Sequence, residues 1–367
     1  MQTSASPARR TLLRTGAATL SAVALLSLAA CGGGSTAATG AAPAATAPST
    51  DKTVAVNIGY FPNLTHAPGL VADAEGFFTK RIGDGKVKTQ SFNAGPDVVQ
   101  ALFGGSLDIA YIGPNPTINA YAQSGGAAVR VISGATSGGA SLVVKPEITT
   151  AAQLEGKTLA TPQLGNTQDV ALRHWLKEQG LTTTVDGGGD VSIKPQKNSA
   201  ALQAFASGQV DGAWVPEPFA TQFVAAGGKV LVDEKTLWPG GKFVTTNVVV
   251  RTEFLQKNPD TVRAFLEANL DAIDFIAAEP AKAQTDVATK ISAITGQEVK
   301  PATLAAAWGN LTFGADPLQA TLKESAKHAQ AVGLLEKAPS DDFAKLWDLA
   351  QLNAALKSRG QAEVAAL

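Results

Sequence analysis

Two stretches of the chain, "VQALFGGSLDIAYI" (99–112) and "LQAFASGQVDGAWV" (202–215), repeat one pattern, and each residue of the second lies 103 positions after its partner in the first. Both contain Gln-Ala followed by Leu or Phe, pass through small residues, and continue with Gly-x-[Leu/Val]-Asp and an aromatic-aliphatic pair. The pattern predicts a short helix that stops at a glycine, followed by a buried strand with Asp108 or Asp211 at its start. The repeat therefore predicts two similar halves.

The same offset continues toward the N-terminus. It places "VAVNIGYFPN" (54–63) over "KTLATPQLGN" (157–166), so that Asn63 aligns with Asn166. Both stretches open a strand-loop-helix unit, and strands alternate with helices elsewhere, for example over 54–60, 67–78 and 87–92. We expect an α/β protein with two lobes, each built on a small mixed sheet flanked by helices.

Two further stretches predict how the lobes are joined. "GATSGGASLVV" (134–144) and "GKFVTTNVVV" (241–250) are typical of strands that cross between lobes. Two crossings form a hinge and permit closure around a ligand. We expect the first lobe to comprise 53–142 plus 247–360 and the second lobe 143–246. The segment from Asn258 to about Lys357 is predicted to be helical, with an apolar stripe that packs on the first lobe.

In open parallel sheets, ligands bind beyond the carboxyl ends of the strands. Four predicted loops meet that condition: 61–66, 113–117, 162–168 and 216–219.

The third of these loops introduces "TPQLGNTQDVALRHWL" (161–176), where small polar residues precede a helix. Asn166 or Thr167 can cap a helix that starts near Gln168, and the free amides of its first turn favour a carboxylate, phosphate or sulfonate. Thr65, His66 and Asn115 give two other loops a similar character. Ordinary turn and capping chemistry is the alternative for each loop, but convergence of the loops favours a shared anion pocket.

The stretch "WVPEPF" (214–219) has two interpretations. Trp214 aligns with Tyr111 in the repeat, so it is either a core aromatic residue at a strand end or a residue of the cleft. Glu217 lies between two prolines and faces a ligand amine, a transport partner or solvent.

Composition and motifs give little support to other functions. His66, His174 and His328 do not have the spacing of metal ligands, and we find no nucleophile elbow, P-loop or dinucleotide fingerprint. The formal net charge is −1 without a basic stripe, which disfavours nucleic-acid binding. We expect no catalytic residue, metal or cofactor.

The N-terminal region predicts export. Arg9, Arg10 and Arg14 precede a short apolar stretch (20–28), so that 1–30 is typical of a signal peptide. "LAAC" (28–31) resembles a bacterial lipobox with Cys31 as the lipidated residue, the alternative being an ordinary cleavage site. Residues 31–52 then form the lipidated cysteine and a flexible tether. We expect an exported protein, lipid-anchored to the outer face of the cytoplasmic membrane, and the paired arginines leave the Sec and twin-arginine routes open.

Sulfur usage is low, because Met1 and Cys31 are the only sulfur-containing residues. Sulfur economy and drift in an Ala/Gly-rich genome both account for this composition.

The stretches "IGYFPNLTHAPGLVADAEGFF" (58–78), "GATSGGASLVV" (134–144) and "TPQLGNTQDVALR" (161–173) resemble the substrate-binding lipoproteins of bacterial ABC importers. The resemblance is to the nitrate/sulfonate/taurine group, related to binders of thiamine-pyrimidine precursors, and runs from about Val54 to about Phe275. It implies a type II periplasmic-binding-protein fold, an ABC permease and, through it, a cytoplasmic ATPase as partners. The candidate ligand-binding residues are Asn63, Thr65, His66, Gly113, Asn115, Gly165, Asn166, Thr167, Gln168, Trp214, Glu217, Thr245 and Thr246.

The resemblance predicts a monomeric solute receptor that binds an aliphatic sulfonate, either an alkanesulfonate or taurine. The Gly-Asn-Thr run (165–167) resembles the sulfonate binders, and no lysine matches the one expected in a nitrate binder. Nitrate or a thiamine-pyrimidine precursor remains an alternative ligand, and a pyrimidine-precursor synthase-type enzyme is an alternative from a different class.

Overall fold

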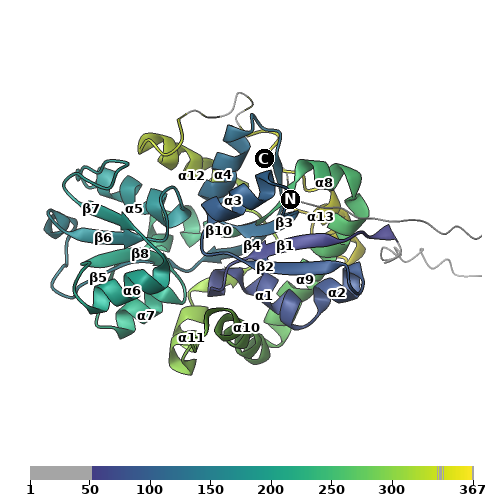
Figure 1. The fold of residues 1–367 in the computed structure, drawn as a ribbon, viewed down its shortest axis with the longest axis horizontal. Coiled ribbons are helices and arrows are strands. Elements are labelled where there is room, and N and C mark those ends of the chain that lie inside the picture. The colour runs from purple at the N-terminus through teal and green to yellow at the C-terminus, as the bar shows by residue number, and fades with distance from the viewer. Residues whose placement is uncertain (1–51, 337, 339–340, 342, 366–367) are drawn as a thin grey trace, which may run out of the picture. The chain divides into compact units, whose positions relative to one another are not determined.

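The computed structural model describes residues 52–336, 338, 341 and 343–365, and its strands form two separate sheets (Figure 1). The first sheet contains β1 (Val56–Tyr60), β2 (Val87–Ser91), β3 (Ile109–Ile112), β4 (Val129–Gly138), β10 (Val244–Arg251) and β11 (Leu311–Phe313). The second contains β5 (Ala140–Val144), β6 (Thr158–Thr161), β7 (Ser192–Pro195), β8 (Gly212–Pro216) and β9 (Lys229–Asp233). The strand orders are β11-β4-β10-β3-β1-β2 and β7-β6-β8-β5-β9.

The helices alternate with these strands through the first two thirds of the chain. The α-helices are α1 (Ala67–Ala74), α2 (Phe77–Ile82), α3 (Gly95–Phe103), α4 (Pro114–Gln123), α5 (Thr167–Glu178), α6 (Asn198–Ala206), α7 (Phe219–Ala225), α8 (Thr252–Lys257), α9 (Pro259–Ala278), α10 (Pro280–Thr295), α11 (Pro301–Trp308), α12 (Gln319–Ala331) and α13 (Ala350–Ser358). Short 3-10 helices are η2 (Leu64–His66), η3 (Ala151–Leu154), η4 (Glu234–Leu237) and η5 (Pro239–Gly241).

The two sheets share one topology, which confirms the predicted α/β class. In the first, β1 pairs in parallel with β2 and β3, and β10 runs antiparallel beside β3. In the second, β6 pairs in parallel with β7 and β8, and β5 runs antiparallel beside β8. Each sheet is therefore mixed, and we call each sheet with the helices that cover it the first and the second lobe.

The repeated aspartates perform the same task in both lobes. Asp108 Oδ2 accepts a hydrogen bond from the backbone N–H of Asn57 at 2.9 Å, and Asp108 Oδ1 pairs with Arg251 at 2.7 Å. Asp211 Oδ2 accepts from the N–H of Thr158 at 2.9 Å, and its Oδ1 pairs with Lys145 at 2.7 Å. Each carboxylate thus joins the first strand of its parallel set to a cation from an antiparallel strand or the residue just after one.

Strand alternation divides each core into two layers, because successive side chains point to opposite faces. Tyr111 packs with α1, α2 and α9, while Ile112 packs with α3 and α4 on the other face. Trp214 packs with α5, while Val215 packs with α6 and α7. Full burial of a large apolar side chain contributes about 1.5–3 kcal/mol, so these layers hold each lobe together.

The chain passes between the sheets twice. It leaves the first sheet at the end of β4, turns at Gly139, and enters the second sheet with β5. It returns between the end of β9 at Asp233 and the start of β10 at Val244. These points lie within a few residues of the predicted limits at 142/143 and 246/247, and the domain limits themselves stay a prediction.

The C-terminal segment from α9 onward is mostly helical and packs on the first lobe, as predicted, but the prediction was wrong at β11 (Leu311–Phe313), which forms an edge strand of the first sheet. In addition, it contacts the second lobe, because α12 lies against α5 and α11 against α7. The rings of His174 on α5 and His328 on α12 stack with centroids 3.7 Å apart. The tail therefore touches both lobes. The predicted signal peptide, Cys31 and tether lie outside the described residues.

Candidate functional site

A small cavity lies where the carboxyl ends of the parallel strands of both lobes meet. Its volume is about 20 Å³, room for about one water molecule. We call it the inner cavity, and its lining residues are Phe61, Asn63, Thr65, His66, Asn93, Gly113, Pro162, Asn166, Thr167, Gln168, Asn198, Pro216 and Thr245. These residues follow or end β1, β2, β3, β6, β7 and β8, with Thr245 added from β10. The position is the one expected for a ligand in this kind of sheet.

Asn63 and Asn166, which the repeat aligns, use their side-chain oxygens in the same way. Asn63 Oδ1 accepts from Thr65 Oγ1 at 2.5 Å, and Asn166 Oδ1 accepts from the N–H of Thr167 at 2.7 Å. Neither Nδ2 donates to another residue in the part of the chain that the structure describes. Each side chain is fixed through its oxygen, which leaves its two N–H donors for a ligand.

His66 adds a third neutral donor. Its Nδ1 accepts a hydrogen bond from the backbone N–H of Phe61 at 3.2 Å, and the centroids of the Phe61 and His66 rings lie 4.2 Å apart. Burial lowers the pKa of His66 from 6.5 to about 3, because the charged form is desolvated. The ring is therefore neutral at physiological pH, with its proton on Nε2.

The second lobe supplies a helix N-terminus. Asn166 is the N-cap of α5, which starts at Thr167, one residue earlier than predicted. The amides of the first turn have no intrahelical partner and carry a partial positive charge. Thr167 is 5% exposed, and its Oγ1 has no hydrogen-bond partner among the described residues. An unpaired buried hydroxyl beside a helix N-terminus is a donor suited to an anion.

A buried ion pair shapes the loop before α5. Asp169 accepts from Thr161 Oγ1 at 2.9 Å, from the N–H of Gly165 at 2.9 Å and from Arg173 Nε at 3.1 Å. Arg173 also donates to the carbonyl of Thr184. Gly165 adopts φ +74°, which a side chain would strain. The loop geometry is therefore set by residues behind the cavity wall.

The two lobes meet directly around the cavity. A Cβ placed on Gly113 would lie 2.3 Å from Thr167 Oγ1, so a side chain at this position would displace the Thr167 hydroxyl. The N–H of Leu64 donates to the carbonyl of Glu217 at 3.1 Å across the lobes. The small cavity volume follows from these contacts.

Eight of the predicted residues line the inner cavity: Asn63, Thr65, His66, Gly113, Asn166, Thr167, Gln168 and Thr245. Five do not: Asn115, Gly165, Trp214, Glu217 and Thr246.

These five residues contact other parts of the protein, outside the inner cavity. Asn115 Nδ2 donates to the carbonyl of Ser325 at 3.1 Å, and Trp214 Nε1 donates to Glu234 at 2.7 Å. The Trp214 ring belongs to the core on the α5 face of β8. Burial raises the pKa of Glu234 to about 7. Gly165 binds Asp169, and Thr246 lies buried within β10.

Glu217 does not face solvent. It is 2% exposed and accepts from Asn310 Nδ2 at 2.7 Å and from Thr221 Oγ1 at 3.0 Å. Burial raises its pKa above the ordinary value, against the effect of these hydrogen bonds. Glu217 therefore links the second lobe to the tail.

Five lining residues were not among the predicted site residues: Phe61, Asn93, Pro162, Asn198 and Pro216. Phe61, Pro162 and Pro216 lie within predicted loops. Asn93 directly follows the predicted strand 87–92, so the strand-end rule could have found it. Asn198 follows β7, whose exposed residues give little strand signal.

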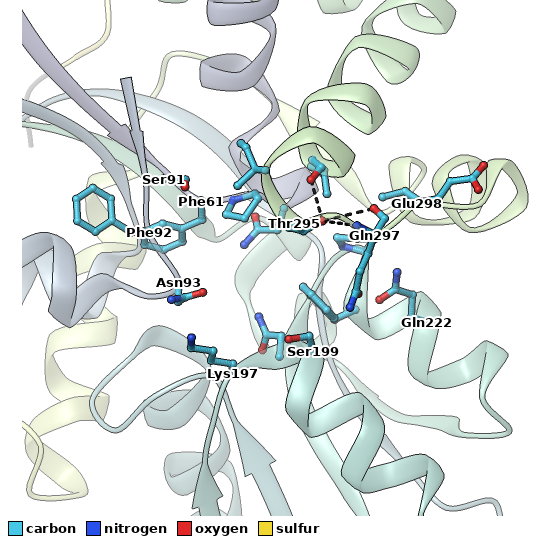
Figure 2. Close-up of a pocket in the computed structure, with 18 residues that line it drawn as sticks. Phe61, Ser91, Phe92, Asn93, Lys197, Ser199, Gln222, Thr295, Gln297 and Glu298 are labelled. Carbon is cyan, nitrogen blue, oxygen red and sulfur yellow. Dashed lines mark hydrogen bonds between the residues drawn. The ribbon is translucent and has the colours of Figure 1, made fainter. Parts of the chain in front are cut away.

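A larger chamber adjoins the inner cavity, and Figure 2 shows the residues around it. Its volume is about 320 Å³, and we call it the outer chamber. It shares Phe61, Asn63, Asn93 and Asn198 with the inner cavity, so the two spaces lie next to each other.

The inner cavity has no charged wall: none of its described lining residues is Asp, Glu, Lys or Arg. Within the described ranges, no cluster of three or more His, Cys, Asp or Glu could hold a metal ion. No described helix has the length and apolar character needed to cross a membrane. Because no charged side chain among the described residues lines the inner cavity, the cavity offers a ligand only neutral hydrogen-bond donors.

Comparison with known proteins places the chain in a family. Residues 49–292, more than half of the chain, match the NMT1-like family. The taurine-binding periplasmic protein of Escherichia coli (strain K12) is 31% identical over 221 residues, which cover 59% of this chain and 66% of that protein.

Solved structures show the same fold. The alkanesulfonate-binding protein SsuA of Xanthomonas axonopodis pv. citri, bound to MOPS, superposes with a TM-score of 0.66 at 20% identity, covering 79% of this chain and 98% of that one. The nitrate-binding protein NrtA of Synechocystis PCC 6803 gives 0.68 at 17% identity, covering 84% and 89%.

Two mixed sheets that enclose a polar cavity at their strand ends define a periplasmic-binding-protein fold. The chain belongs to the NMT1-like family, and its predicted relation to the nitrate/sulfonate/taurine group of ABC-importer substrate-binding proteins is confirmed.

Proposed function

We propose that this protein is the extracytoplasmic solute receptor of an ABC importer and that it binds an aliphatic sulfonate between its lobes. The observation that carries the proposal is the arrangement of donors. Asn63 and Asn166 come from opposite lobes, each with its oxygen satisfied and its N–H₂ group left to donate. His66 and Thr167 add neutral donors beside them.

Such a set of donors suits a group with a delocalised negative charge and several acceptor oxygens. Hydrogen bonds to an ionised acceptor contribute about 1.5–3 kcal/mol each, more than bonds between neutral groups. The N-terminus of α5 favours an anion without a cationic side chain. Taurine and alkanesulfonates, which relatives of this chain bind, both carry a sulfonate group of this kind.

The proposal extends to the transport cycle. A protein of this class delivers its solute to a permease, and a cytoplasmic ATPase drives the import. We propose that the chain is exported, acts as a monomer and is anchored by lipid on Cys31. The inner cavity has room for about one water molecule, so the lobes must separate to load it and must lie further apart around a bound sulfonate group than they do in this structure.

Nitrate is the second candidate ligand. The small volume of the inner cavity favours a small anion, and a structural relative binds nitrate. The inner cavity has no lysine among its lining residues, which favours the sulfonate. A pyrimidine-precursor synthase-type enzyme on this scaffold is a third possibility, which any turnover of ligand would favour.

The test is thermal unfolding of the purified protein with methanesulfonate, hexanesulfonate, taurine, nitrate, sulfate and a thiamine-pyrimidine precursor. A ligand at a hundred times its Kd stabilises the folded state by about 2.7 kcal/mol, a shift of several degrees. We expect shifts with sulfonates. A shift with nitrate or the pyrimidine precursor alone would replace the sulfonate as ligand while retaining the receptor function.

A further inference from the structure

The outer chamber has the size of a small-molecule site. Its volume of about 320 Å³ lies within the range of ligand pockets, about 300–1,000 Å³. It adjoins the inner cavity, because Phe61, Asn63, Asn93 and Asn198 line both spaces. Since the inner cavity has room for about one water molecule, an organic group bonded to an anion held there needs the neighbouring space of the outer chamber.

Three parts of the chain build the walls of the chamber (Figure 2). The first lobe contributes the loops after β1 and β2, and the second contributes the starts of α6 and α7. The third wall comes from the C-terminal tail, at the end of α10 and the following turn. Its residues are Ile291, Ile294, Thr295, Gln297, Glu298 and Val299.

The third wall is a fixed helix end. Thr295 Oγ1 donates to the carbonyl of Ile291 at 2.8 Å and accepts from the N–H of Gln297 at 3.2 Å. Gly296 caps α10 in the left-handed conformation at φ +71°, and its N–H donates to the carbonyl of Ser292 at 2.8 Å. A wall held in this way can discriminate between ligands of different shape.

The chemistry of the chamber is amphipathic. Phe61, Phe92, Phe219 and Ile294 present apolar surface. Lys197 is exposed at the rim, and its ammonium group has no hydrogen bond or ion pair with another residue in the described part of the chain. In the view of Figure 2, Lys197 and Asn93 extend toward one another from opposite lobes. An apolar segment of several carbons, with or without a polar end, fits these surroundings.

We infer that the outer chamber binds the organic part of the sulfonate and that the tail segment 291–299 makes the receptor selective for chains of several carbons. This inference rests on the proposed function, since it takes the sulfonate group to lie in the inner cavity. It names unbranched alkanesulfonates longer than methanesulfonate as the preferred ligands. The tail segment is then part of the binding site although it lies outside both repeated halves.

Calorimetric titration of the full protein with methane-, propane-, butane- and hexanesulfonate tests the inference. We expect affinity to rise by up to about fourfold for each added methylene, the change that corresponds to about 0.8 kcal/mol of buried CH₂. Gln222→Trp, on α7, and Gln297→Trp, on the tail, fill the chamber from two walls. Each is expected to lower the ratio of hexane- to methanesulfonate affinity by roughly tenfold or more.

Two matched variants control for the added indole. Val224 lies on α7 and Ala293 on α10, both are exposed, and neither lines the chamber. Val224→Trp and Ala293→Trp are expected to keep the wild-type ratio. Circular dichroism spectra of all four variants check that each of them folds.

The outcomes separate the inference from the proposed function. Equal affinity of the wild-type protein for every chain length overturns the inference and leaves the receptor function intact. A ratio unchanged in both Gln222→Trp and Gln297→Trp also overturns it, and a change in Gln222→Trp alone removes the tail from the site. If no sulfonate binds, including methanesulfonate, the inference and the proposed function both fail.

Discussion

Replacement of Thr167 by valine should change stability and ligand binding in opposite directions. The hydroxyl is buried without a partner among the described residues, at 5% exposure of the whole residue. An unsatisfied buried polar group costs about 1–3 kcal/mol. Valine has the same shape without the hydroxyl. We therefore expect the free energy of unfolding of ligand-free Thr167→Val to be about 1 kcal/mol larger than that of the wild-type protein.

Binding should weaken in the same variant. A hydrogen bond from Thr167 to a charged oxygen contributes about 1.5–3 kcal/mol, which corresponds to roughly ten- to hundredfold in Kd. Urea unfolding and isothermal titration measure the two quantities on one preparation. Unchanged affinity, or a loss of stability without ligand, would refute the role assigned to Thr167.

Thr136 provides the matched control for this experiment. Its Oγ1 is also buried without a partner among the described residues, and it does not line the inner cavity. Thr136→Val should gain stability by a similar amount and keep the wild-type affinity. A parallel loss of affinity in Thr136→Val would mean that the valine acts through the sheet and not through a missing contact with ligand.

Two other substitutions test the closed cavity and its histidine. In Gly113→Ala the new Cβ meets Thr167 Oγ1 at 2.3 Å, so either the Thr167 hydroxyl turns out of its position or the lobes stay further apart, and calorimetry should show affinity lower by about 1–3 kcal/mol. Gly309→Ala, whose Cβ meets only the Ala306 carbonyl at 3.6 Å, should bind normally. The folded-state pKa of His66, about 3, lies below its unfolded value of 6.5. The unfolded chain therefore binds the proton first, and stability falls as pH drops below about 6.5. Between pH 7 and pH 5 the wild-type protein should lose about 2 kcal/mol more stability than His66→Gln in urea titrations, because His328 and the other titrating groups contribute equally to both proteins. Equal pH slopes in the two proteins would show that His66 is not buried as a neutral ring.

The parts of the fold that follow from local patterns were predictable from the sequence. The repeat located Asp108 and Asp211, because each begins a buried strand and the two strands have nearly the same sequence pattern. It also aligned Asn63 with Asn166, and the structure places both at the inner cavity. Loop position relative to strand ends was enough to find these residues.

Other features depend on contacts that no local pattern encodes. Alternation along β8 puts Trp214 and Val215 on opposite faces, but only the packing of α5 against the Trp214 face makes Trp214 a core residue and not a residue of the cavity. Glu217 is fixed by Asn310, which lies 93 residues away. Asn198 follows a strand with one buried residue, so the apolar run that marks other strands is missing there. The sequence also did not indicate that the tail segment 291–299 lines the outer chamber, because its position there results from tertiary packing.

The contact of the tail with both lobes has a consequence for how affinity can change. Separation of the lobes must alter contacts such as the one between Asn310 and Glu217 and the stacked rings of His174 and His328. The free energy of these contacts contributes to the equilibrium between open and closed forms. The fraction of protein in the binding-competent form scales the apparent affinity for every ligand by the same factor. Substitutions at the interface of α12 with α5 could therefore tune the working concentration range of the receptor. Evolution could in this way adjust sensitivity to solute supply and leave the choice of solute unchanged.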